Sequence, residues 1–424
     1  MKERVSIFAV ELILQVEKSS QSDYRIKYNT NTTHMNNRIY GIIGAVIGDI
    51  VGSRFEPRSK KIPTKPFKLF AADCTFTDDS MMTIAIADAL LNGTSFEEAM
   101  RTWGNRYPAA GYGGNFRHWL KGEGRTTSAG NGSGMRISPV GFRGKTLDEV
   151  LEMAKEATVP SHNSREGITA AQAIASSIFL AHNGKSKEDI KKYVESTFKY
   201  DLDRSEDDIK LDVQRNRGNY FRAQHATPIA IIAFMNGIDY EDVIRRAVSY
   251  DGDTDTVACM AGSIAAAFYG VPVELAEQAA YYLPKDVLDV INAFDGTALT
   301  NHRVTPPNVR RWSHKTVVVY GCNADDTEGE KGFLDTHFSK LYNHNPMKGF
   351  PIHTIGTSME VIRNDVKALI AKVKAEPEKT FVIEDVGIGK KTNLGVEVMA
   401  PLFAPLKDAE NVYFVKEYWA YYNA

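Results

Sequence analysis

Hydrophobic positions in the first 300 residues recur at helical spacing or fill whole segments, and strand-like alternation is missing there. Segments 39–51, 168–181 and 257–269 are apolar along most of their length, which is typical of buried helices. Segments 146–149 and 186–189 begin with Thr or Ser and end with an acidic residue, the pattern of a capping box before an amphipathic helix. Residues 37–300 are therefore predicted to form an all-α domain.

The pattern changes after about residue 301. Pro306-Pro307 indicates a linker over residues 301–315. Short runs at 316–320, 381–383 and 411–414 are rich in Val, Ile, Phe and Tyr, and a helical segment at 358–374 lies among them. Strands that alternate with helices predict a small α/β domain over residues 316–424 with a mostly parallel sheet. A boundary near residue 305 predicts that residues 37–305 fold alone.

The chain start, composition and charge narrow the class of protein. Residues 1–36 are expected to form a mobile extension, and Met35 is an alternative start to Met1. No stretch reaches the ~18 apolar residues that a membrane span needs. The net charge of −2 gives no basic field for nucleic acid, and three widely spaced cysteines form no disulfide or zinc pattern. These features favour a cytoplasmic protein.

One acidic stretch carries most of the candidate chemistry. Residues 250–256, Tyr-Asp-Gly-Asp-Thr-Asp-Thr, place three carboxylates within five positions directly before the apolar segment 257–269. Carboxylates this close repel one another unless a cation or hydrogen bonds compensate their charge. Hard oxygen ligands at the start of a buried helix favour Mg²⁺ or a related ion. The alternative interpretation is that Asp253 or Asp255 is an ordinary N-cap residue.

A second stretch repeats this arrangement. Thr77-Asp78-Asp79-Ser80 stands immediately before the apolar segment 81–91. Two acidic, hydroxyl-rich helix starts can face each other and share one or two metal ions. We predict that both stretches together form the active centre.

Glycine-rich segments supply further candidates. The dinucleotide fingerprint needs a strand–loop–helix context that segment 39–51 lacks, so its glycines indicate close helix packing instead. This helix is expected to carry Asp49 inward, with Glu56 just beyond its end. Loop 128–136 suits backbone N–H groups that face a phosphate, and the helix start after His162 is a second candidate anion site. Flexible surface loops are the alternative for both.

Together these motifs resemble the ADP-ribosylglycohydrolase family across residues 37 to about 297. They occur in the family's order: Gly44-x₃-Gly48-Asp49-x₂-Gly52, Glu56, Phe76-Thr77-Asp78-Asp79, Gly130-Asn131-Gly132-Ser133-Gly134-Met135-Arg136, His162-Asn163 with Glu166-Gly167, and Gly252-Asp253-Thr254-Asp255-Thr256. The resemblance implies an all-α fold with two Mg²⁺ ions, or Mn²⁺ in their place. It implies these metal ligands: Thr77, Asp78, Asp79, Asp253, Asp255 and Thr256.

The resemblance also implies hydrolysis of the C1″ glycosidic bond that joins ADP-ribose to a protein side chain or a nucleic acid. Glu56 matches an acidic residue that the family places beside the scissile bond, and the candidates for proton transfer are Glu56, Asp78, Asp253 and Asp255. The expected substrate contacts are Tyr112, Phe116, Gly130, Asn131, Gly132, Ser133, Gly134, Met135, His162 and Gly252. A sensor that binds ADP-ribose without turnover, or an inhibitor of an ADP-ribosyltransferase, is the alternative.

Two departures from the family pattern leave the linked residue or base open. Ser164-Arg165 stands where bacterial relatives usually have His-Pro, and Asp251 replaces a common glycine. The tail resembles a Rossmann- or macro-like domain through Gly321-Cys322-Asn323 and Val386-Gly387, although Asp325, Glu328, Glu330 and Lys390 replace expected glycines. It is expected to bind ADP-ribose, a nucleotide or a partner protein.

Overall fold

The computed structural model describes residues 37–56, 66–124, 126–306, 308–309, 311–323, 348–389, 392 and 394–424. The predicted N-terminal extension, Pro307, and the tail positions Asp325, Glu328, Glu330 and Lys390 lie outside these residues. Among the described residues, no helix is both long and apolar enough to cross a bilayer.

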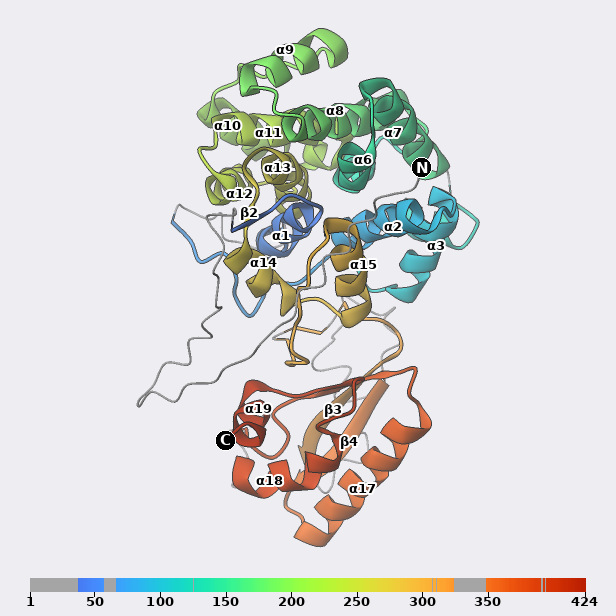
Figure 1. The fold of residues 1–424 in the computed structure, drawn as a ribbon, viewed down its shortest axis with the longest axis vertical. Helices are drawn as coiled ribbons and strands as arrows, with labels where there is room; N and C mark the ends of the chain where they lie inside the picture. Colours follow the sequence, from blue (N-terminus) through green and yellow to red (C-terminus); the bar gives the residue numbers. More distant parts are fainter. Residues whose placement is uncertain are drawn as a thin grey trace, which may run out of the picture. The chain divides into compact units, whose positions relative to one another are not determined.

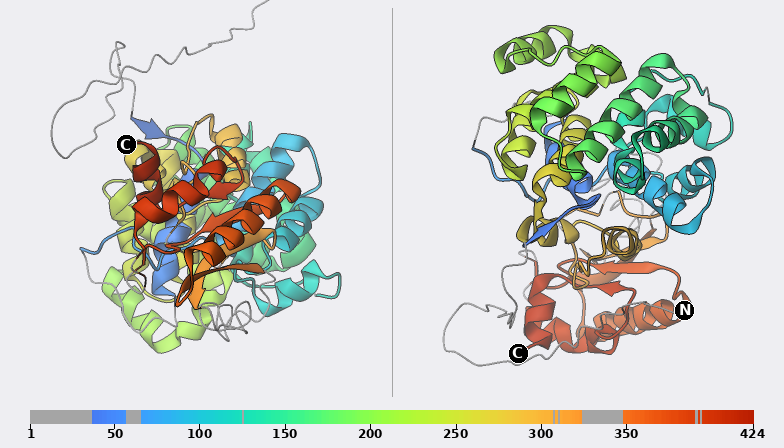
Figure 2. Two further views of the ribbon diagram at one scale, coloured as in Figure 1. Left: turned by 90° about the horizontal axis from the view of Figure 1, so that it is seen from below. Right: turned by 45° about the horizontal axis from the view of Figure 1, so that its top comes forward.

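The predicted all-α domain is helical, as Figures 1 and 2 show from three directions. Its helices are α1 (Ile43–Gly52), α2 (Asp78–Asn92), α3 (Phe96–Arg106), α4 (Gly114–Leu120), α5 (Gly132–Met135), α6 (Ser138–Arg143), α7 (Leu147–His162), α8 (Arg165–His182), α9 (Lys187–Phe198), α10 (Glu206–Asn216), α11 (Ala223–Asn236), α12 (Tyr240–Ser249), α13 (Thr254–Tyr269), α14 (Val273–Ala280) and α15 (Lys285–Asp295). Two short 3₁₀ helices, η1 (Ser53–Phe55) and η2 (Arg217–Phe221), join them.

The sequence patterns predicted where helices occur more accurately than where each helix begins and ends. Segment 39–51 was predicted as helix from its first residue, but α1 begins at Ile43, because Arg38–Ile39 forms strand β1 against β2 (Val271–Pro272). This two-residue antiparallel pair corrects the expectation that the domain has no strands. The predicted capping box at Ser186 is complete, since its side chain and that of Asp189 each receive a backbone N–H.

Helices α1 and α13 lie side by side at the centre of this domain because glycines line their contact (Figure 1). A Cβ atom on Gly48 would lie 2.1 Å from the Ala258 carbonyl oxygen, and one on Gly52 would lie 2.4 Å from the Thr254 carbonyl oxygen. No side chain fits there without moving a backbone. The glycines along this contact therefore set how closely Asp49 on α1 approaches the acidic start of α13.

Replacing Gly48 with Ala is expected to lower the melting temperature and the activity together. The new methyl group meets backbone atoms, so the two helices must separate, and overpacking of this kind costs roughly 1–3 kcal/mol of unfolding free energy. Thermal melting and a turnover assay measure both effects. Gly218→Ala is the matched control, because a Cβ there has no neighbour within 4 Å. Equal melting temperatures for the two variants would contradict the close approach.

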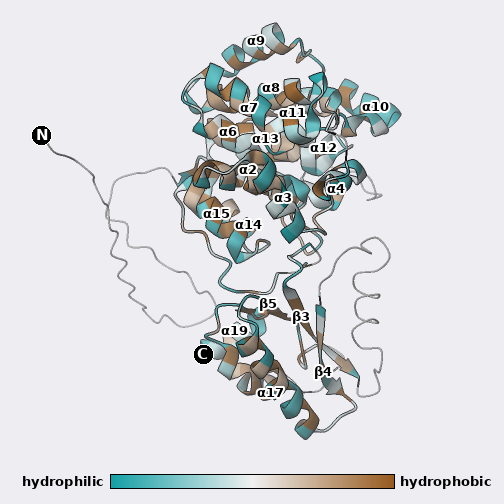
Figure 3. Ribbon diagram, turned by 90° about the vertical axis from the view of Figure 1, so that its right-hand side faces the viewer, coloured by the Kyte–Doolittle hydropathy of each residue, from teal (hydrophilic) through white to brown (hydrophobic). Residues whose placement is uncertain are grey.

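The tail is an α/β layer with a four-stranded parallel sheet in the order β4-β3-β5-β6. The strands are β3 (Thr316–Asn323), β4 (Lys348–Ile355), β5 (Thr380–Ile383) and β6 (Val412–Tyr413), and the helices are α17 (Met359–Ala375), α18 (Val396–Phe403) and α19 (Lys416–Tyr422), with the 3₁₀ turn η3 (Ala404–Leu406). Three strands and α17 were predicted; β4 was missed because its sequence contains Gly, Pro and His among few apolar residues. Hydropathy colouring shows a mixed surface on α17, whose buried stripe runs through Ile362, Val366 and Leu369 (Figure 3).

Two buried hydrophobic clusters occupy the described chain. One belongs to the tail and contains Val317, Val319 and Phe381 on one face of the sheet. The other fills the helical domain and continues past the predicted boundary near residue 305, where its members are Val309, Trp312, Val318, Tyr320, Cys322, Val382 and Tyr413. Alternate residues of β3 thus belong to different clusters, as the two-residue period of a strand requires.

Candidate active site

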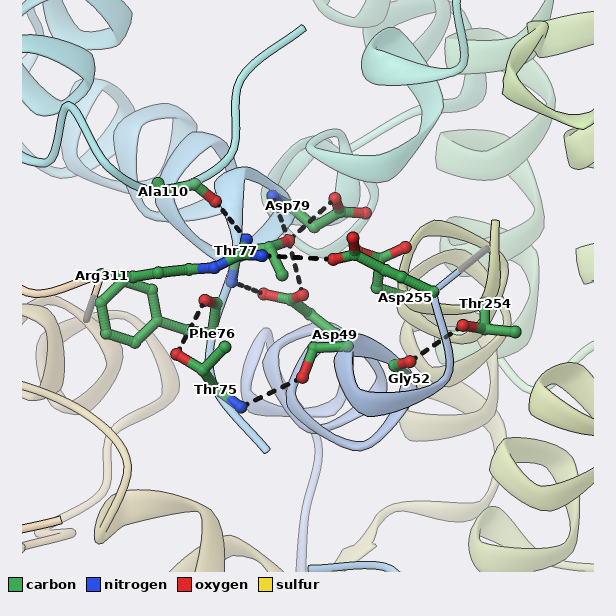
Figure 4. A network of polar contacts seen from close by, with 12 residues as sticks. Asp49, Gly52, Thr75, Phe76, Thr77, Asp79, Ala110, Thr254, Asp255 and Arg311 are labelled. Atoms are coloured by element: carbon green, nitrogen blue, oxygen red, sulfur yellow. Dashed lines mark hydrogen bonds and ion pairs between the residues drawn. The ribbon is translucent and has the colours of Figure 1, made fainter. Parts of the chain in front are cut away.

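Three helices each bring one buried carboxylate to the same point. Asp49 comes from α1, Asp79 from the first turn of α2 and Asp255 from the first turn of α13. One oxygen of each lies within 4.8 Å of the others, and all three side chains are buried. Figure 4 shows these side chains converging, with Thr77 between them. The two acidic stretches predicted to face each other therefore do so.

Asp49 joins α1 to the start of α2. Its Oδ2 accepts hydrogen bonds from the backbone N–H of Thr77 (2.7 Å) and of Ser80 (3.0 Å), and the Ser80 hydroxyl also donates to it. The Thr77 hydroxyl donates to its Oδ1 at 2.6 Å. Asp79 is less well supported: its Oδ2 accepts from the Thr77 hydroxyl at 3.2 Å, but its Oδ1 is buried and has no hydrogen-bond partner among the described residues.

Burial and mutual repulsion make these carboxylates costly to ionise. Desolvation raises the pKa of Asp79 and of Asp255 well above the usual value, and neighbouring carboxylates raise both further. Burial also raises the pKa of Asp78 to about 7 and that of Asp253 to about 6. A divalent cation would offset this charge, and a set of carboxylate oxygens with one oxygen unpartnered fits the hard ligands that Mg²⁺ prefers.

Helix capping does not account for the acidic stretch before α13. Asp253 occupies the N-cap position, yet its side chain makes no capping hydrogen bond. Its Oδ2 accepts instead from the side-chain amide of Asn131 at 2.6 Å. At α2 the cap is Thr77, whose hydroxyl accepts from the Asp79 N–H at 3.2 Å. The carboxylates of both stretches are thus left free of the capping role.

A cavity of about 590 Å³ opens beside these carboxylates. The sequence-predicted residues that line it are Glu56, Asp78, Asp79, Asp253, Asp255, Thr256, Tyr112, Phe116, Gly130, Asn131, Gly132, Met135 and His162. Four other predicted residues do not line it: Thr77, Ser133, Gly134 and Gly252.

The four residues outside the cavity wall have internal contacts. The Thr77 hydroxyl bonds Asp49, and the Ser133 hydroxyl donates to the Gly167 carbonyl at 2.8 Å. Gly134 faces Met260, whose sulfur would lie 2.8 Å from an added Cβ. Gly252, at φ +84°, faces Tyr220 and serves the turn before α13. Ser133, Gly134 and Gly252 thus contact other parts of the protein and do not line the cavity.

Some backbone donors of the two predicted anion sites are already bonded within the protein. In the glycine-rich loop, the N–H groups of Gly130, Asn131 and Gly134 donate to Ser128 Oγ, the Phe221 carbonyl and the Asn131 carbonyl respectively. At the start of α8, the Ser164 hydroxyl accepts from the Gly167 N–H at 3.0 Å. These N–H groups therefore stabilise the local fold through their hydrogen bonds.

Aromatic side chains form one wall of the cavity. The ring centroids of Tyr112 and Phe116 lie 5.5 Å apart, and Phe116 stacks on Trp119 at 5.0 Å. Tyr112 is almost fully buried, whereas Phe221 is 46% exposed while it lines the cavity. Phe116 and Phe221 are thus the rings best placed to meet a ligand. Sequence analysis did not single out Phe221, which lies in a polar segment.

The Asp251 departure has a structural explanation. Asp251 adopts φ +67°, a left-handed conformation that glycine takes without strain and that Asp tolerates better than most residues. Its carboxylate accepts a hydrogen bond from the Arg217 guanidinium, which holds it in place. Asp251 does not line the cavity.

Two charged residues that sequence analysis did not assign also belong to the site. Arg136 is fully buried beside the cavity, and two of its nitrogens, Nε and Nη1, have no hydrogen-bond partner among the described residues. Arg311 reaches the cavity from the segment predicted to be a linker. The Arg136 motif was visible in the sequence, but nothing local indicates that residue 311 enters a site formed by residues 49–256.

A profile of the ADP-ribosylglycohydrolase family matches residues 31–302. The chain belongs to this family. As an ADP-ribosylglycohydrolase it is a hydrolase of glycosidic bonds, as the sequence motifs predicted. The carboxylates, the aromatic wall and the glycine-rich loop all lie within the matched region, and Arg311 lies beyond it.

Relatives of this ADP-ribosylglycohydrolase include two named hydrolases. It is 28% identical over 276 residues to the ADP-ribosylarginine hydrolase Tri1 of Pseudomonas putida, which covers 57% of this chain and 73% of the relative. It is 24% identical over 305 residues to the ADP-ribosylhydrolase ARH3 of Xenopus tropicalis, which covers 54% of this chain and 86% of the relative. A solved ADP-ribosylglycohydrolase-related protein complex has a TM-score of 0.46 at 22% identity and covers 61% of this chain and 97% of that one.

Proposed function

We propose that this chain hydrolyses the C1″ glycosidic bond of ADP-ribose attached to a protein side chain or a nucleic acid, with a divalent cation at the acidic centre. The observation that carries the proposal is the meeting of Asp49, Asp79 and Asp255, all buried, beside a cavity of about 590 Å³. Family membership supplies the reaction class, and both named relatives act on ADP-ribosylated substrates.

The proposed metal ions are assigned from the oxygen atoms that the acidic residues and Thr256 offer as ligands. Residues proposed to hold two Mg²⁺ ions, or Mn²⁺, are Asp78, Asp79, Asp253, Asp255 and Thr256, with Asp49 and Thr77 behind them. A bound cation supplies Lewis-acid polarisation and lowers the pKa of a coordinated water. Asn131 orients Asp253 through its 2.6 Å hydrogen bond, and the Asp49 network fixes the start of α2.

The remaining residues are proposed to bind and to transfer protons. Cleavage builds positive charge on the ribose, which carboxylates at the cavity wall stabilise. Glu56 is proposed to move the proton of the attacking water, because it lines the cavity and is 32% exposed. The adenine is proposed to stack on Phe116 or Phe221. Arg136, which lines the cavity with two unpartnered nitrogens, is proposed to bind the pyrophosphate.

A substrate panel tests the function. Chemically defined ADP-ribosyl-arginine, ADP-ribosyl-serine and ADP-ribosylated oligonucleotide are incubated with the full chain in Mg²⁺ or in EDTA, and free ADP-ribose is measured. Release from at least one substrate, abolished by EDTA and restored by Mg²⁺, is expected. Tight binding of ADP-ribose without release from any substrate would favour the sensor instead.

The tail is proposed to be a Rossmann- or macro-like module for ADP-ribose, a nucleotide or a partner protein. Parallel sheets bind ligands at the carboxyl ends of their strands. There, an added Cβ on Gly321 would lie 2.9 Å from the Thr354 hydroxyl and 3.8 Å from the Gly387 nitrogen, so the ends of β3 and β4 and the turn after β5 approach closely. Calorimetric titration of ADP-ribose into the full chain would then give two sites per chain, whereas one site would leave the tail as a partner surface.

A further inference from the structure

One cavity residue comes from outside the region that the family profile matches. Arg311 lies nine residues beyond the end of that region, at residue 302, and lines the cavity with the acidic residues. Its side chain is 8% exposed. Figure 4 shows its side chain extending toward the converging aspartates.

Arg311 contacts residues of the helical domain that lie at the cavity. Its Nη2 donates to Glu56 Oε1 at 3.3 Å, and its Nη1 donates to the Ala110 carbonyl. An added Cβ on Gly111 would lie 2.6 Å from Nη1 and 3.4 Å from an Asp78 oxygen, so only glycine leaves room for the guanidinium there. Gly111 has φ +113°, which independently favours glycine.

The sheet of the tail holds the backbone that carries Arg311. The adjacent Trp312 is buried and packs edge-on against Tyr413 of β6, with ring centroids 5.2 Å apart. Backbone hydrogen bonds also link Thr305 to Phe414 (2.8 Å) and Phe414 to Arg303 (3.0 Å). The position of Arg311 therefore depends on residues of the tail.

From these contacts we propose that Arg311 is a positioning residue for Glu56, and that the chain beyond the matched region completes the active site. Glu56 follows directly after η1, and among the described hydrogen bonds and ion pairs its carboxylate is paired with Arg311. The guanidinium donates to one oxygen of the Glu56 carboxylate and so fixes the orientation of the group. This inference rests on the proposed role of Glu56.

Full-chain variants test the proposal with ADP-ribosyl-arginine, or whichever substrate the panel selects. Arg311→Gln is expected to lower kcat by on the order of 10–100-fold, because small misplacements of a reacting group cost rates of this size. The KM and the Mg²⁺ midpoint are expected to stay near those of the unmodified chain. Arg311→Lys, which keeps the charge but not the planar fork, is expected to recover part of the loss.

Arg303→Gln is the matched control, since Arg303 lies in the same segment but donates to the Ala409 and Lys407 carbonyls of the tail. Its kcat is expected to stay near the unmodified value. A double-mutant cycle then separates positioning from general destabilisation. The double variant that carries both Arg311→Gln and Glu56→Gln is expected to be no slower than Glu56→Gln alone. Both changes disable the same function, proton transfer by Glu56, which can be lost only once.

Three results would overturn the proposal while the role of Glu56 stands. The first is an unchanged kcat in Arg311→Gln, and the second is a double variant whose loss of kcat equals the product of the two single losses. The third is a raised KM in Arg311→Gln with kcat unchanged. The last would assign Arg311 to substrate binding. If Glu56→Gln itself turns over at the unmodified rate, the proposed role of Glu56 fails first, and positioning of Glu56 fails with it.

Discussion

Asp255→Asn is expected to abolish Mg²⁺-dependent hydrolysis while the protein stays folded. Asn keeps the size of Asp and an oxygen that can accept from the Thr256 N–H, but it removes one of three charges that converge from α1, α2 and α13. Cation catalysis is worth several kcal/mol of transition-state stabilisation, and each ~1.4 kcal/mol is tenfold in rate, so kcat should fall by about a thousandfold or more.

The same substitution should leave the cation-free protein as stable as before, or more so. In the unmodified chain, burial and neighbouring carboxylates raise the pKa of Asp255, so its charged form is disfavoured in the fold. Removing that charge relieves repulsion at neutral pH. Melting in EDTA, calorimetric Mg²⁺ titration and a turnover assay together measure the three effects.

An exposed acidic group provides the control for this experiment. Glu195, Asp201 and Asp203 also approach within 4.8 Å of one another, but they lie at the surface, and Asp203 is 77% exposed. Asp203→Asn should change neither Mg²⁺-dependent turnover nor the tight Mg²⁺ site. Unaltered turnover in Asp255→Asn would remove the basis for a metal centre here.

Glu56→Gln is expected to slow hydrolysis by about 10²–10⁴-fold with Mg²⁺ binding nearly intact, because loss of a general acid or base typically costs that much. Glu56 lines the cavity, yet it does not belong to the buried group of Asp49, Asp79 and Asp255. Rate measurements at saturating substrate and a Mg²⁺ titration separate the two effects.

Glu206→Gln is a close match for comparison. Glu206 is also a half-buried glutamate that accepts from an arginine, Arg246, but it lies outside the cavity lining. It should retain the unmodified rate. Full activity in Glu56→Gln would shift proton transfer to Asp78, Asp253 or Asp255, the other carboxylates predicted for that step.

The location of the acidic residues could be predicted from the sequence because they are concentrated at helix starts. Asp78, Asp79, Asp253 and Asp255 stand in short stretches before apolar segments, so their location in the fold follows from local patterning. Asp49 was placed inward for the same reason, although its membership of the buried group depends on how closely α1 approaches α13. That distance is set by glycines on both helices.

Other parts of the site depend on long-range packing, which local patterns do not contain. Arg311 is separated from Glu56 by 255 positions, and its segment contains Pro, Asn and Arg, which read as a linker. Ser133 and Gly134 were predicted to contact substrate as part of a glycine-rich loop; they do not line the cavity, and they contact Gly167 and Met260. Strand β4 lacked the apolar run by which the other strands were found.

The buried cluster that continues from the helical domain onto β3, β5 and β6 bears on how this protein denatures. A chain of two domains joined by a solvated linker unfolds in separate steps. Two units that share one hydrophobic core unfold together, because neither keeps its core when the other unfolds. Val318, Val382 and Tyr413 belong to the helical domain's cluster, so exposing the sheet also exposes that cluster. Calorimetry should therefore record one cooperative heat-absorption peak for the helical and α/β parts together, and any ligand that stabilises the tail should raise the temperature at which hydrolysis is lost.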